Sequence, residues 1–164
     1  MISFKKDSFF KAYQEGKNFI PIIKTWPADL ETPLSIWLKL SNEDSHGVFL
    51  ESVEGGENLG RWSIVAVDPL WEAVCHGKET TKTWNSGKSE IYKGDPFDLL
   101  RTWTEEYKSY SLENLPYIGQ LYGSWGYELI NYVEPNVPIN RLEGKEIPYG
   151  SWMFFDQLVI FDQM

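Results

Sequence analysis

Residues 47–69 read GVFLESVEGGENLGRWSIVAVDP, two apolar runs around a polar middle that is rich in glutamate and glycine. The runs at 47–52 and 61–69 predict two β-strands, because both carry β-branched and aromatic residues and Asp68-Pro69 ends the second. A solvated turn is the ordinary role of such a polar middle. A turn between two paired strands also presents polar groups at a sheet edge, which suits a small-ligand site.

The polar groups of this stretch have the chemistry that a free amino acid needs. A carboxylate binds an ammonium group, hydroxyl and guanidinium donors bind a carboxylate, and apolar neighbours bind a side chain. Carboxylates also suit acid–base chemistry or a divalent cation, but the run lacks the Asp/Asn repeat of a calcium loop. The sequence therefore predicts a ligand-binding edge formed by Leu50, Glu51, Ser52, Arg61, Trp62 and Ser63.

Composition limits the classes of protein to which the chain can belong. Its 164 residues match one ordinary domain, and 42% apolar with 16% aromatic residues are enough for a packed core. The net charge of -9 argues against a nucleic-acid partner. There is no run of about 18 apolar residues and no secretory signal pattern, so we expect no membrane partner. The single Cys75 excludes an internal disulfide and fits a cytoplasmic location.

Helices and strands are mixed along the chain, which favours an α+β fold with a mostly antiparallel sheet and several short helices. The helix after Thr32 is expected to bury Leu34, Trp37 and Leu38. Helices are predicted at 8–16, 33–40 and 96–108, and strands at 18–23, 47–52, 61–69, 70–77, 89–94 and 150–164, with a strand that leads into a short helix within 117–135.

Two other patterns have structural rather than chemical interpretations. Gly119, Gly123 and Gly126 are spaced unlike a dinucleotide-binding loop, so we interpret them as positions of close packing. Cys75 and His76 are neighbours on a predicted strand and point to opposite faces, which argues against a catalytic pair. No Cys/His cluster offers a zinc site, and neither a catalytic residue nor a metal ligand is predicted in this chain.

Three segments resemble anthranilate synthase component I, a member of the chorismate-utilising enzymes. Residues 50–69, LESVEGGENLGRWSIVAVDP, resemble the L-E-S-x-E-G-G-E-x-x-G-R-[YW]-S segment near the N-terminus of that family. Residues 19–40 are similar to the family's strand, D-x-x-T-P step and following helix, and residues 117–135 to a later glycine- and tyrosine-rich segment. The last segment departs from the family's pattern at Gln120, Ser124, Glu128 and Asn131.

This resemblance implies that residues 1–164 form the N-terminal, regulatory domain of a longer enzyme. The absent C-terminal domain would bind chorismate and Mg²⁺, and a glutamine amidotransferase subunit would supply ammonia for the synthesis of anthranilate, a lyase reaction of tryptophan biosynthesis. Residues 1–164 are expected to bind no cofactor and to be inactive alone. The resemblance assigns Leu50, Glu51 and Ser52 to the allosteric feedback site for L-tryptophan, with Arg61, Trp62 and Ser63 along the same edge.

Two alternatives stay open from the sequence alone. The N-terminal region of aminodeoxychorismate synthase component I, which serves folate synthesis, looks similar to the same segments. A different class is a stand-alone module that binds a small ligand or a protein, in which the tryptophans and the final strand would form the docking surface. Residues that follow Met164 in the open reading frame would separate these alternatives from the first interpretation.

Overall fold

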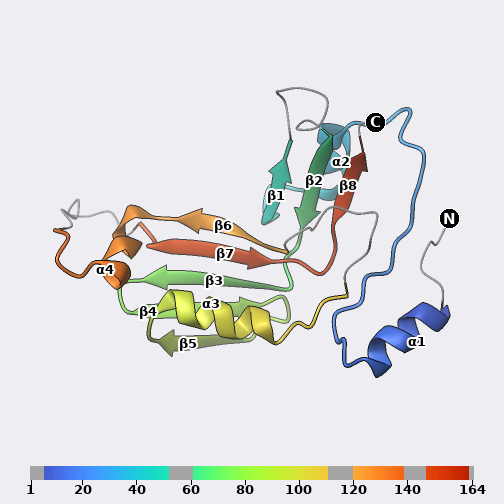
Figure 1. Ribbon diagram of the computed structural model, residues 1–164. Coiled ribbons are helices and arrows are strands. Elements are labelled where there is room, and N and C mark those ends of the chain that lie inside the picture. The colour runs from blue at the N-terminus through green and yellow to red at the C-terminus, as the bar shows by residue number, and fades with distance from the viewer. Residues whose placement is uncertain (1–5, 52–60, 111–119, 139–146, 163–164) are drawn as a thin grey trace. The chain divides into compact units, whose positions relative to one another are not determined.

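The computed structural model describes residues 6–51, 61–110, 120–138 and 147–162. These residues form short helices and antiparallel sheets, which confirms the predicted α+β class (Figure 1). They divide into two compact units, which are described separately. The first unit comprises 6–30 and 96–110, and the second comprises 31–51, 61–95, 120–138 and 147–162.

The first unit contains two helices, α1 (Lys6–Gln14) and α3 (Pro96–Glu105). Helix α3 confirms the helix predicted at 96–108, although it ends before residue 108. Leu100 and Trp103 are three residues apart on α3 and both are buried, as the three- and four-residue spacing of its apolar positions requires.

Asn18 links two distant segments of this first unit. Its side-chain oxygen accepts a hydrogen bond from the Lys108 backbone N–H at 2.6 Å, and Phe19 forms an isolated parallel bridge with Ser109. The strand predicted at 18–23 is therefore wrong, because only Phe19 among these residues makes a bridge. Pro21 has no N–H to give to a strand ladder, which explains why the pairing does not continue.

The larger sheet of the second unit has five strands: β3 (Trp71–His76), β4 (Glu79–Trp84), β5 (Ser89–Lys93), β6 (Leu121–Trp125) and β7 (Gly150–Phe154). They are antiparallel in the order β5-β4-β3-β7-β6 (Figure 1).

The sequence prediction lacks β4, because ETTKTW has no apolar residue before its last position. In the structure the Lys82 ammonium nitrogen is buried 4.4 Å from the centroid of Trp71, where the ring face stabilises the cation.

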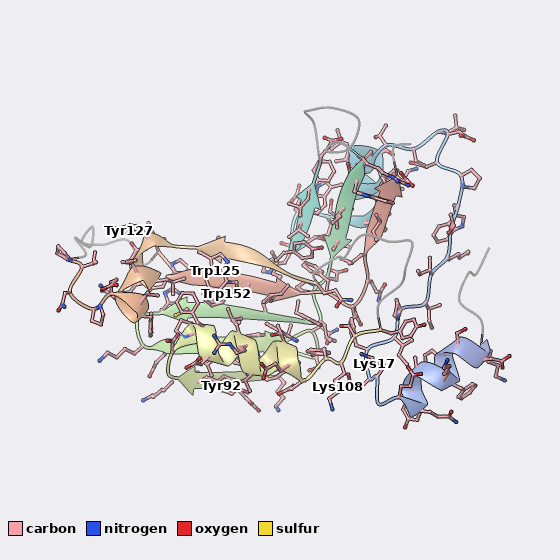
Figure 2. The ribbon with its side chains drawn as sticks, viewed as in Figure 1. Lys17, Tyr92, Lys108, Trp125, Tyr127 and Trp152 are labelled. Carbon is pink, nitrogen blue, oxygen red and sulfur yellow. The ribbon has the colours of Figure 1, made fainter. Side chains whose placement is uncertain are left out.

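Aromatic side chains fill one face of this five-stranded sheet. Trp71 and Phe154 lie opposite each other and stack with ring centroids 5.2 Å apart. The buried Trp152 makes an edge contact with Trp125 at 4.9 Å (Figure 2). A Cβ atom at Gly123 would lie 2.7 Å from Cδ1 of Trp152, so a larger residue does not fit beside the indole. The interpretation of this glycine as a position of close packing is confirmed.

The predicted final strand at 150–164 is wrong in its continuity, because it is two strands in two different sheets. Strand β7 belongs to the five-stranded sheet, and β8 (Val159–Asp162) belongs to a second sheet. Between them, Asp156 and Gln157 are exposed, which shows that the chain leaves the first sheet there.

The strand predicted to lead into a short helix within 117–135 is confirmed. Strand β6 is followed by a 3-10 turn (Tyr127–Leu129) and α4 (Ile130–Val133).

The second sheet of this unit contains β1 (Gly47–Leu50), β2 (Trp62–Val67) and β8 in the order β1-β2-β8. All three strands are antiparallel, and the pairing of β1 with β2 confirms the two strands predicted in residues 47–69. Helix α2 (Pro33–Leu40) packs against β2 and lies behind the sheet in the view of Figure 1.

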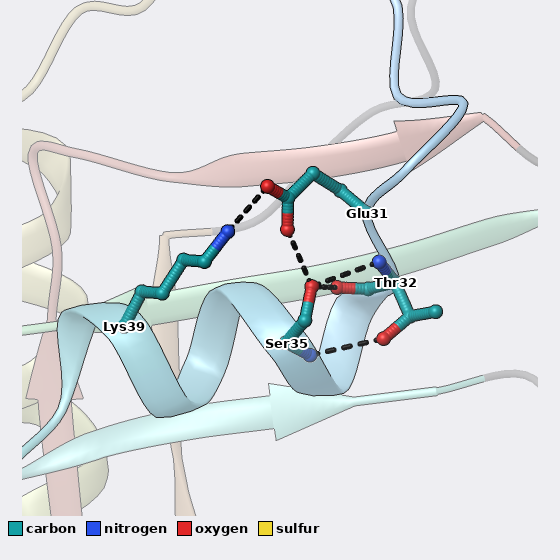
Figure 3. A network of polar contacts seen from close by, with 4 residues as sticks. All are labelled: Glu31, Thr32, Ser35 and Lys39. Atoms are coloured by element: carbon teal, nitrogen blue, oxygen red, sulfur yellow. Dashed lines mark hydrogen bonds and ion pairs between the residues drawn. The ribbon is translucent and has the colours of Figure 1, made fainter.

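The N-terminus of α2 is held by a reciprocal hydrogen-bond pair (Figure 3). The Ser35 backbone N–H donates to the Thr32 hydroxyl at 3.0 Å, and the Thr32 backbone N–H donates to the Ser35 hydroxyl at 2.9 Å. Glu31 accepts hydrogen bonds from Lys39 and from the Ser35 hydroxyl, and these lower the pKa of its carboxyl group. These local bonds satisfy backbone donors and define where the helix starts.

The face that α2 presents to the sheet differs from the prediction. Trp37 packs over the sheet, since a Cβ atom at Gly47 would lie 3.0 Å from its ring, and the Trp37 and Phe49 ring centroids are 6.1 Å apart. Leu34 and Leu38 are 52% and 67% exposed, so their predicted burial is wrong. They are four residues apart and are therefore neighbours on the helix surface.

Candidate functional site

Strand register divides the predicted ligand-binding residues between the two faces of the three-stranded sheet. Leu50 lies opposite Ile64, and Trp62 lies opposite Asp162. Because side chains alternate along a strand and paired residues share a face, these four residues lie on one face. Trp62 and Ile64 are half-buried, and Leu50 is 47% exposed. We call this surface, formed by Leu50, Trp62, Ile64 and Asp162, the strand-edge face.

Ser63 lies on the opposite face from Trp62 and is fully buried. The same face carries Phe49 and Val65, which pair with each other across β1 and β2. Trp37 of helix α2 packs against Phe49 on this side. The fold therefore separates Ser63 from the strand-edge face, and its predicted ligand contact stays a prediction.

Arg61 immediately precedes β2 and makes two directed hydrogen bonds. Its Nε donates to Oδ1 of Asp162 at 2.7 Å, and its Nη2 donates to Oδ2 at 2.6 Å. The guanidinium carbon also lies 4.5 Å from the ring centroid of Trp62. The hydrogen bonds to Asp162 raise the pKa of Arg61, so the guanidinium stays charged.

Two of the remaining predicted residues are at the end of β1. Leu50 is the last residue of the strand, and Glu51 follows it with an exposed side chain. Ser52 lies outside the described residues, so its position next to Arg61 and Trp62 stays a prediction. The structure therefore brings Arg61 and Trp62 into contact with each other and places Leu50 on the same face as Trp62.

Asp162 is the member of this cluster that sequence reasoning missed. It lies 101 residues from Arg61 in the chain, and no local spacing links the two. An arginine predicts an acidic partner, but the sequence contains 24 acidic residues and does not show which of them pairs with Arg61. Only the pairing of β2 with β8 selects Asp162.

Cys75, the single cysteine of the chain, has a structural environment. Cys75 is buried, and burial raises the pKa of its thiol, which confirms its structural interpretation. In the described ranges there is no group of three or more His, Cys, Asp or Glu side chains that could hold a metal ion. A search of the same ranges finds no helix with the length and apolar character needed to cross a membrane.

Comparison with known proteins gives relatives that align along nearly the whole chain. Anthranilate synthase component 1 of Synechocystis sp. (strain ATCC 27184 / PCC 6803 / Kazusa) is 44% identical over 165 residues, covering 100% of this chain and 32% of that protein. The protein of the same name from Acetivibrio thermocellus is 33% identical over 157 residues, covering 94% of this chain and 31% of its own length. No family model matches the chain.

A solved structure has the same fold over most of the chain. The crystal structure of anthranilate synthase component I from Streptococcus pneumoniae TIGR4 matches 86% of this chain and 29% of that protein, with a TM-score of 0.50 and 23% identity. The chain thus spans about a third of the length of the curated relatives that it matches. From its identity with these relatives along its whole length, the chain belongs to the anthranilate synthase component I family.

Proposed function

We propose that residues 1–164 form the N-terminal regulatory part of an anthranilate synthase component I. The observation that carries this proposal is the 44% identity along the whole chain to a protein of that name. In the intact enzyme, a C-terminal domain would bind chorismate with Mg²⁺, and a glutamine amidotransferase subunit would deliver ammonia. No observation favours the aminodeoxychorismate synthase or stand-alone alternatives.

The regulatory part of the proposal concerns the edge where β1 and β2 meet. L-Tryptophan would bind there through Leu50, Glu51, Ser52, Arg61 and Trp62. Support comes from the chemistry of the described members, which offer an exposed carboxylate, a charged guanidinium and apolar side chains on neighbouring strands. This mixture matches the ammonium, the carboxylate and the indole of the amino acid. Ser63 would contribute by supporting the sheet from its buried face.

Feedback inhibition requires that tryptophan prefer one state of the whole enzyme over another. Residues 1–164 alone would then bind tryptophan weakly, because the coupled catalytic part is absent. The first test is an assay of this chain with chorismate, Mg²⁺ and ammonium, in which we expect no anthranilate. Formation of anthranilate by residues 1–164 would contradict the proposed division between a regulatory and a catalytic part.

The second test replaces Ser52 by arginine in the intact polypeptide that contains this chain. We expect Ser52→Arg to abolish inhibition by L-tryptophan while anthranilate synthesis continues, because the long cation fills the space for the ligand. Ser86→Arg is a matched control, since Ser86 is exposed in the turn between β4 and β5. Inhibition that is unchanged in Ser52→Arg would remove Ser52 from the site.

A further inference from the structure

The Nε–Nη2 edge of the Arg61 guanidinium is already occupied by an internal carboxylate. Asp162 accepts one hydrogen bond on each of its carboxylate oxygens, at 2.7 and 2.6 Å, and so uses the fork-shaped edge of the guanidinium. An α-carboxylate of an amino acid needs the same planar pair of donors. A ligand carboxylate that takes the same Nε–Nη2 edge would therefore have to displace Asp162 from it.

The pair is accessible to exchange. The Arg61 and Asp162 side chains are 36% and 39% exposed, and exposed ion pairs contribute little net stability because water solvates both partners. When the Asp162 carboxylate moves away, water can replace its hydrogen bonds. The Trp62 ring face lies 4.5 Å from the guanidinium carbon and provides a second contact that does not depend on Asp162.

We propose that Asp162 competes with the carboxylate of the ligand for Arg61, and thereby lowers the affinity of the proposed site at Arg61 and Trp62 for an amino acid. This inference rests on the proposed function of that site. Binding would exchange one carboxylate for another at Arg61, and the displaced Asp162 would stay ionised in water. Asp162 is thus a residue that sets the sensitivity of the site without contacting the ligand.

The competition predicts an unusual result for the removal of one charge. In the intact polypeptide, Asp162→Asn keeps the size of the side chain and weakens its hold on Arg61. We expect L-tryptophan to bind about two- to fivefold more tightly to this variant by isothermal titration calorimetry, in line with the small energies of exposed ion pairs. The tryptophan concentration that half-inhibits anthranilate synthesis should fall by the same factor.

Three controls separate competition from a general effect on the fold. L-Tryptophanamide has no carboxylate, so Asp162→Asn should not improve its binding. Arg61→Gln should weaken the binding of L-tryptophan, and adding Asp162→Asn to it should change nothing further, because the proposed competition requires the Arg61 guanidinium. Asp98→Asn removes a different exposed Arg–Asp pair, with Arg101 at 2.8 Å, and should leave tryptophan binding unchanged.

The outcomes distinguish this inference from the function on which it rests. If Asp162→Asn leaves tryptophan binding unchanged or weakens it while thermal unfolding stays normal, the competition is overturned and the proposed site survives. Equal tightening of tryptophanamide would also overturn it. If the unsubstituted polypeptide shows neither tryptophan binding nor inhibition, the proposed function fails and this inference fails with it.

Discussion

The two sheets of the second unit differ in how completely their apolar side chains are removed from water. In the five-stranded sheet, Trp71 and Trp152 are 0% and 1% exposed. In the three-stranded sheet, Trp62 and Ile64 keep part of their surface accessible, and Leu50 keeps about half. Both sheets are rich in aromatic and branched residues, so composition does not explain the difference.

The comparison shows that similar strands serve different purposes in this molecule. The five-stranded sheet buries the large rings of Trp71, Trp152 and Phe154, and burial of such rings favours folding. The three-stranded sheet buries one face under α2 and keeps the other partly accessible, with a charged pair at its end. A partly accessible apolar surface beside charged groups is what a small-ligand site requires.

The largest effect that would sharpen this comparison is expected from Trp152→Ala. Removal of a buried indole should lower the free energy of unfolding by about 3–5 kcal/mol, because the cavity beside Gly123 cannot close fully. Urea unfolding followed by circular dichroism measures the change. Trp125→Ala is the control, since Trp125 is 52% exposed and its loss should cost less. Equal losses for the two variants would contradict the packing described here.

A smaller effect should distinguish the two faces of the three-stranded sheet. Val65→Ala on the buried face should cost about 2 kcal/mol, and Leu50→Ala on the accessible face about 1 kcal/mol, although leucine loses more atoms. Thermal unfolding of both variants under the same conditions tests this order. A larger loss for Leu50→Ala would mean that the strand-edge face is packed rather than accessible.

The smallest effect is expected at Tyr122, on the other face of the five-stranded sheet. Its hydroxyl is buried and has no hydrogen-bond partner among the described residues. Tyr122→Phe should therefore leave stability unchanged or raise it by up to about 1 kcal/mol at neutral pH. Unfolding in urea at pH 7 measures this effect, and a clear loss of stability would indicate a partner for the hydroxyl.

Alkaline pH gives a second measurement of the same tyrosine. Burial raises the pKa of Tyr122 from 10.0 to about 12. Between these values the unfolded chain loses the phenolic proton while the folded chain keeps it, so stability falls as the pH rises. Tyr122→Phe should reduce this fall. An unchanged dependence on pH in the variant would assign the effect to other groups.

The sequence determined those parts of the fold whose interactions are local. The strands within residues 47–69 were predictable from their residue types, and the start of α2 from Thr32 and Pro33, because pairing and capping there involve near neighbours. The α+β class followed from the mixed order of predicted helices and strands, and the helix predicted at 96–108 is α3. The candidate site was predictable only as a set of residue types near one turn.

Only the tertiary structure decided which of those residues share a face and which partners they have. Alternation along the predicted strand already separated Trp62 from Ser63, but strand register placed Trp62 opposite Asp162, and packing put the Ser63 face under α2. The burial of Lys82 depends on rings contributed by two strands, and the ion pair of Arg61 joins positions 101 residues apart. These contacts join segments that are far apart in the chain. Local residue patterns do not show which distant strand will pair with a given strand, so the contacts were not predictable from the sequence.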